Sequence, residues 1–110
     1  MSGYVDLKEL LKKYETSGIF EIEETIGVWE FHIQDCPKNL KIKVVKIEPQ
    51  GKFMGIANYG IKNPQQATHY WSLKLCDSIQ EALEDALRGF LTFWNPKDAS
   101  KTDFKLYDNW

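Results

Sequence analysis

Apolar residues recur at helical spacing in a short segment near the start of the chain, at Leu7, Leu10, Leu11 and Tyr14. Asp6 is a residue type that caps helices, and Glu9 follows it at the spacing of a capping box. Gly18 suits the left-handed backbone conformation that ends many helices. The pattern therefore predicts a first helix that begins after Asp6 and ends before Gly18.

A longer apolar stripe in the last third of the chain predicts a second helix. Ser78 and Glu81 form a capping box at its start, and the Asn95-Pro96 pair ends it. The stripe itself consists of Ile79, Ala82, Leu83, Ala86, Leu87, Phe90, Leu91 and Trp94.

Between the two helices, residues 19–34 and residues 40–47 alternate between apolar and polar positions, as strands do. Each segment changes the phase of its alternation once. If residues 34–39 form a hairpin loop, the two phase changes fall at the same level. The facing pairs are then Ile33–Leu40, Phe31–Ile42, Trp29–Val44, Val28–Val45 and Ile26–Ile47. This pattern predicts a sheet that is covered on one face at one end and on the opposite face at the other end.

The next residues, Pro49-Gln50-Gly51, are typical of a turn. A three-residue turn pairs Lys41 with Tyr59 and predicts a third strand over about residues 52–59. A two- or four-residue turn would shift this strand by one position and move Tyr59 to the other face of the sheet.

Two further segments complete the predicted arrangement. Residues 69–76 alternate as a fourth strand, after a polar connection over residues 60–68. The tail from residue 97 onward is expected to dock on the rest of the molecule, because it carries the large apolar residues Phe104, Leu106, Tyr107 and Trp110.

Together these elements predict an α+β fold in a single domain of residues 1–110. The order is an N-terminal helix, an antiparallel β-meander of about four strands, a long amphipathic helix packed on one sheet face, and a docked C-terminal tail. The long helix is expected to cover the face that carries Trp29, Phe31, Ile33, Ile42, Val44 and Ile56. The first helix, the tail or a second subunit could cover the apolar end of the other face. A protein partner or a homodimer is therefore expected to use that partly apolar face.

The charge pattern argues against a dedicated nucleic-acid module. The chain has a net charge of −2, and Arg88 is its one arginine, the residue type that best reads phosphates and guanine edges. Six lysines lie within residues 38–62, which leaves single-stranded nucleic-acid binding by these strands as an alternative. Residues 15–35 carry six acids and neither Lys nor Arg, however, and the two stretches are adjacent strands in the predicted register, so their charges largely offset each other.

Cys36 and Cys76 are the two cysteines, too few for a disulfide-dependent secreted domain of this size. The sequence shows neither an apolar signal core nor a membrane span, so we expect reduced thiols and a cytoplasmic location. Zinc binding by these cysteines with His32 and His69 lacks the tight ligand spacing of structural zinc sites. No metal, cofactor or catalytic residue is predicted, since the common nucleophile, phosphate-loop and metalloprotease motifs do not occur.

The predicted register places one polar cluster on the sheet. His32, Lys41 and Tyr59 form a row across three strands, and Glu30 and Lys43 lie in the next row. These five residues are the candidate ligand-binding site. The function expected from the sequence is a small, non-enzymatic interaction or small-ligand-binding domain. An enzyme that uses this His, Lys, Tyr and Glu cluster is a second alternative, after nucleic-acid binding.

Overall fold

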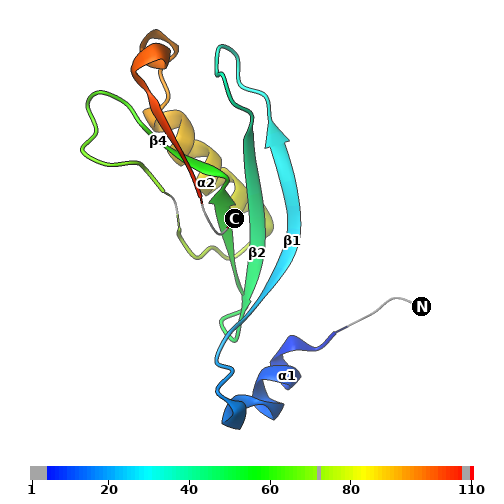
Figure 1. Cartoon of the computed structure of the whole chain (residues 1–110). Helices are drawn as coiled ribbons and strands as arrows, with labels where there is room; N and C mark the ends of the chain where they lie inside the picture. The colour runs from blue at the N-terminus through cyan, green and yellow to red at the C-terminus, as the bar shows by residue number, and fades with distance from the viewer. Residues whose placement is uncertain (1–4, 72, 108–109) are drawn as a thin grey trace.

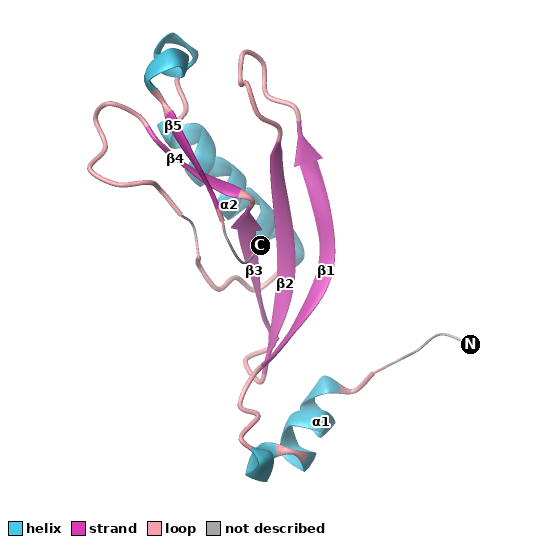
Figure 2. Cartoon of the chain, viewed as in Figure 1, coloured by secondary structure: helices cyan, strands magenta, loops and turns pink. Residues whose placement is uncertain are grey.

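The computed structural model describes residues 5–71, 73–107 and 110. A three-stranded antiparallel sheet has the order β1-β2-β3, and β4 and β5 form a separate two-stranded sheet (Figures 1 and 2). The bounds of the elements are α1 Leu7–Lys13, β1 Ile22–Phe31, β2 Leu40–Glu48, β3 Lys52–Ala57, β4 Tyr59–Lys62, α2 Ile79–Phe93 and β5 Asp103–Leu106, with short 3₁₀ turns at Glu15–Ser17 and Pro96–Lys101. The predicted α+β class is confirmed, including the long helix on one sheet face and the docked tail.

The helix ends form as the capping residues predict. The Asp6 carboxylate accepts a hydrogen bond of 3.1 Å from the backbone N–H of Glu9 at the start of α1. The Ser78 hydroxyl accepts one of 3.1 Å from the backbone N–H of Glu81 at the start of α2. Gly18, with φ of +89°, closes the 3₁₀ turn that follows α1. In each case a side chain or a glycine satisfies the end of the helix locally, which is why these boundaries could be predicted.

The main core lies between α2 and the sheets. Ala82, Ala86 and Phe90 are the buried residues of α2, and the core residues around Ala86 and Phe90 are Leu40, Ile42, Tyr59 and Ile61. A Cβ atom at Gly55 of β3 would collide with the carbonyl oxygen of Ala82. The backbone of α2 therefore rests directly on β3, and only a glycine at this position leaves room for it.

The first hairpin has a different register from the predicted one, although residues 27–31 keep their predicted faces. Phe31 faces Leu40, whereas the sequence pattern paired Ile33 with Leu40, so the strands are offset by two residues. The loop is longer than predicted because it has bonds of its own: the Cys36 N–H donates to the Ile33 carbonyl, and the Asn39 amide donates to the Glu30 carboxylate. A two-residue offset leaves residues 27–31 on their predicted faces, since the side-chain period of a strand is two. Before the bulge at Ile26 the offset is three residues, so residues 22–25 lie on the faces opposite to those predicted.

The two phase changes have different physical origins. In β1 the register shifts between Thr25 and Gly27, so Ile26 is an extra residue in a β-bulge. In β2 the alternation continues without interruption, but Val44 and Val45 are both buried, one on each face of the sheet. The interpretation that the sheet is covered on opposite faces at its two ends is correct for β2.

The second hairpin is offset by one residue from the predicted register. Ile47, and not Glu48, faces Lys52, because the Gly51 N–H bonds to the Ile47 carbonyl at 2.8 Å and closes a four-residue turn. Ile56 therefore faces Lys43 on the side away from α2, and the prediction that α2 covers Ile56 is wrong. Phe53 lies on the α2 side and packs against Val44, Cys76 and Ala82.

The described residues of the 69–76 segment, 69–71 and 73–76, do not form the predicted fourth strand, and Ser72 lies outside the described residues. The segment makes two isolated bridges, Ile61 with Tyr70 and Phe53 with Cys76, and these bridges run along the edges of β4 and β3. The tail supplies the strand instead, since β5 pairs with β4 from Lys62–Asp103 to Tyr59–Leu106. The segment is thus paired with the two sheets at two points, once with β4 and once with β3.

The sheet face opposite α2 is covered partly by the chain itself. Val45 and Ile47 are buried there. The Trp110 indole N–H donates to the Ile56 carbonyl at 2.7 Å, and the Lys43 ammonium donates to the Trp110 backbone oxygen at 3.1 Å. Of the three elements that the sequence offered to cover this face, which are the first helix, the tail and a second subunit, the tail therefore covers at least part of it.

Replacing Gly55 by alanine tests the contact between α2 and β3. We expect Gly55→Ala to lower the free energy of unfolding by about 1–3 kcal/mol, because the added methyl group pushes against the backbone of α2. Gly27→Ala is the matched control, since its methyl group meets the partly exposed ring of Trp29, which has room to shift. That change is expected to cost less than about 1 kcal/mol. Urea denaturation measures both values, and equal losses would contradict the proposed packing.

Candidate functional site

Tyr59 lies in the core and not on the surface where the predicted register placed it. The side chain is 2 % exposed and meets the rings of Phe90 and Phe104 edge-on. Its hydroxyl donates a hydrogen bond of 2.6 Å to the Lys38 carbonyl. Burial raises the pKa of Tyr59, because the phenolate would lose its hydration. The predicted row of His32, Lys41 and Tyr59 therefore does not form. The offset of the first hairpin places Glu30, and not His32, opposite Lys41, and Tyr59 belongs to β4 of the second sheet.

The other four residues of the predicted cluster keep local contacts. Glu30 faces Lys41 across the first hairpin, and the His32 imidazole lies 4.0 Å from the Glu30 carboxylate. These three residues remain together near the end of β1. Lys43 lies apart from them, because its ammonium bonds to the backbone of Trp110 and sits 5.3 Å from the centre of the indole ring.

Lys43 also lines a hollow of about 380 Å³ on the sheet face opposite α2. Ile47 and Met54 of the sheet line this hollow together with Tyr107 of the tail, and the carboxylates of Glu21 and Glu23 stand at the same site. Because Lys43 is already bonded to Trp110, the two acids are the remaining charged groups that line this hollow.

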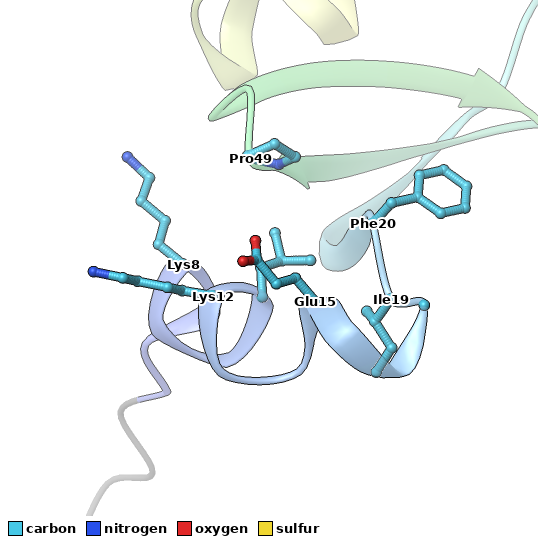
Figure 3. Close-up of a pocket in the computed structure, with 8 residues that line it drawn as sticks. Lys8, Lys12, Glu15, Ile19, Phe20 and Pro49 are labelled. Carbon is cyan, nitrogen blue, oxygen red and sulfur yellow. The ribbon is translucent and has the colours of Figure 1, made fainter.

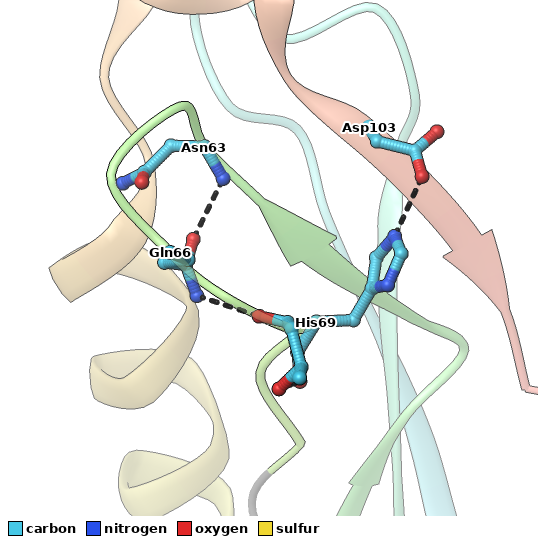
Figure 4. A network of polar contacts seen from close by, with 5 residues as sticks. Asn63, Gln66, His69 and Asp103 are labelled. Carbon is cyan, nitrogen blue, oxygen red and sulfur yellow. Dashed lines mark hydrogen bonds and ion pairs between the residues drawn. The ribbon is translucent and has the colours of Figure 1, made fainter.

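His69 and Asp103 form the tightest polar contact involving a histidine, with 2.7 Å between Nε2 and a carboxylate oxygen (Figure 4). The connection around His69 is folded on itself, since the Gln66 side-chain oxygen accepts from the Asn63 N–H at 2.7 Å. Within the described part of the chain, Asp103 is the one side-chain partner of the imidazole. The pair links this connection to β5.

Both cysteines are free thiols, and they differ in environment. Cys36 is half-buried in the first hairpin loop, where its thiol donates to the Lys38 carbonyl. Cys76 is buried, and burial raises its pKa, so its thiol stays protonated and poorly nucleophilic at neutral pH. Over residues 5–71, 73–107 and 110, no group of three or more His, Cys, Asp or Glu side chains could hold a metal ion. The helices in the same ranges include none that is long and apolar enough to cross a membrane.

The exposed apolar surface is concentrated at the start of the chain. Thirteen large hydrophobic side chains are exposed among the described residues, and eight of them lie within residues 5–29: Val5, Leu10, Tyr14, Ile19, Phe20, Ile26, Val28 and Trp29. Sequence periodicity could not find this surface, because exposure depends on which elements happen to cover a strand. Exposed hydrophobic side chains are ordinarily scattered singly over a protein surface, so their concentration in one segment is unusual.

β1 combines that apolar surface with an open sheet edge. It is ten residues long and pairs only with β2 in the described structure, whereas Phe53 on the far strand exchanges backbone hydrogen bonds with Cys76. Alternate N–H and C=O groups of β1 therefore face away from β2 with no strand beside them. The strand carries Glu23, Glu24 and Glu30 but neither Lys nor Arg.

Comparison of the chain with protein-family models, with curated proteins and with solved structures finds no match. Its function has to be argued from its own residues.

Titration of the tyrosines tests the corrected position of Tyr59. We expect Tyr59 to ionise last, because burial raises its pKa above the usual value of about 10. When phenolate absorbance is followed against pH, the Tyr59→Phe variant should lack the step at the highest pH. The exposed Tyr14 provides the control, since Tyr14→Phe should leave the step at the highest pH in place. If Tyr59 instead ionised near pH 10, its side chain would have to be exposed, and the buried position would be contradicted.

Proposed function

We propose that this protein is a non-enzymatic interaction domain, and that it binds an extended segment of a partner protein along the open edge of β1. The observation that carries the proposal is the edge itself, a ten-residue strand with pairing on one side only. Side chains beside the edge are apolar on both faces of the sheet, since Val28 is 50 % exposed and Trp29, its neighbour in sequence, is 37 % exposed. An added strand would satisfy the backbone groups and cover both side chains.

The charges of β1 define the chemistry of the partner. Glu23, Glu24 and Glu30 give the edge a negative charge, and a second copy of β1 would bring like charges together. An incoming segment with lysine or arginine at alternate positions complements these carboxylates. The bulge at Ile26 divides the edge, so the regular run over residues 27–31 is the natural docking length.

The positions of the lysines support this proposal over the nucleic-acid alternative. Lys41, Lys43 and Lys46 all lie on β2, the central strand, with the acidic strand β1 beside them. Lys43 is bonded to Trp110, and the Lys46 ammonium lies 3.7 Å from the Glu48 carboxylate. A phosphate chain would need a continuous row of free cations, and these contacts interrupt it.

A pair of model peptides tests the proposed edge. An extended peptide of alternating lysine and valine should shift the backbone NMR signals of β1, and the matching glutamate and valine peptide should not. Glu30→Lys is expected to weaken binding of the lysine peptide about five-fold, the scale of one exposed charge pair.

Glu84→Lys is the matched control, because it makes the same change of charge on the exposed face of α2. It should alter the affinity less than two-fold. Equal binding of both peptides, or signal shifts centred on β3 or α2, would contradict strand addition at β1.

A further inference from the structure

A groove of about 520 Å³ lies between α1 and the turn that joins β2 to β3 (Figure 3). Leu11 of α1 and Ile19 and Phe20 of the following segment line it, and Pro49 of the turn closes the opposite side. Figure 3 shows Pro49 above the helix and the two residues 19 and 20 at one end of the opening. The surface of this groove is therefore mainly apolar, although charged residues of α1 and of the turn after it also line it.

The apolar walls of the groove are only partly covered by the protein itself. Leu11 is the buried residue of α1, whereas Phe20 is 83 % exposed, and Ile19 is 43 % exposed. An aromatic ring left in water beside an apolar groove is unfavourable unless something covers it. The volume lies within the range of about 300–1,000 Å³ that is typical of small-molecule sites.

Two lysines supply the charge at the groove. Lys8 and Lys12 are one helical turn apart on the same face of α1, and both ammonium groups project on the same side in Figure 3. Neither makes an ion pair within 4.0 Å in the described structure, where the four ion pairs involve His32, Lys46, Lys52 and His69. Glu15 is the one acid that lines the groove.

We infer that this groove binds a small molecule with an apolar body and a single anionic group, such as a carboxylate or a sulfonate. The apolar body lies against Phe20 and Pro49, and the anion meets the ammonium groups of Lys8 and Lys12. An uncharged ligand would leave the two lysines unused, and a cationic ligand would be repelled by them. The site is separate from the β1 edge, because it is built from α1, residues 18–20 and the β2–β3 turn.

Two fluorescent probes test the charge requirement. Anilinonaphthalene sulfonate has an aromatic body and one negative charge, and N-phenylnaphthylamine is its uncharged analogue. Titrations on the full chain should give one site for the sulfonate, with the uncharged analogue bound more weakly. Phe20→Ser should weaken both probes, because it removes part of the apolar wall.

Charge variants on α1 separate this site from a general attraction to the protein. Lys12→Glu is expected to weaken the sulfonate about five-fold and to leave the uncharged analogue unchanged. Lys13→Glu, the matched control, changes the net charge equally but lies outside the groove, with its ammonium over the Tyr14 ring. It should change the sulfonate affinity less than two-fold.

Glu15→Gln provides a variant of the opposite sign, which should tighten binding of the sulfonate about two-fold, since it removes the acid from the groove. Glu30→Lys, which tests the β1 edge, should leave the sulfonate affinity within two-fold, so the two proposals can fail separately. Equal effects of Lys12→Glu and Lys13→Glu, or sulfonate binding that is insensitive to both Phe20→Ser and Glu15→Gln, would overturn the assignment.

Discussion

The close approach of α2 to β3 at Gly55 is the contact on which the rest of the arrangement depends. Because the backbone of Ala82 lies against this glycine, the small residues of the helix face the strand and Phe90 reaches the cluster around Tyr59. The helix thereby takes one face of the three-stranded sheet and also contacts β4, so it joins the two sheets. Packing at this distance leaves little freedom in where the helix sits, since protein interiors tolerate few voids or overlaps.

The placement of α2 decides what remains exposed. The central strand β2 is buried on both faces, and the tail through Trp110 covers part of the face that the helix leaves open. β1 lies at the edge beyond the helix, and α1 touches the rest of the protein mainly near β2. The β1 edge and all of the groove except Pro49 therefore belong to the first third of the chain, and the remainder supports them.

The parts of the fold that could be predicted are those whose cause is local in sequence. Asp6, Ser78 and Gly18 act within a few residues of themselves, so both helices were predicted with their caps. The one-residue difference in the second hairpin depends on a single hydrogen bond from Gly51 to Ile47, which residue types alone do not specify. That difference moves Ile56 to the face away from α2. The predicted row of site residues is lost because the first hairpin is also offset and because Tyr59 joins β4 of the second sheet. The groove between α1 and the β2–β3 turn depends on how a short helix lies against a distant turn. The periodicity of apolar residues does not specify that arrangement.

The balanced net charge of the chain conceals two local excesses of opposite sign. The β1 edge carries only acids, and the groove side of α1 presents Lys8 and Lys12 beside a single acid. Salt screens exposed charges over about 10 Å, so each surface is expected to respond mainly to the charges nearest to it. The two proposed surfaces therefore call for ligands of opposite charge, a basic strand and a small anion. Net charge, which together with the single arginine argued against a dedicated nucleic-acid module, does not describe the local charge that a ligand meets at one surface.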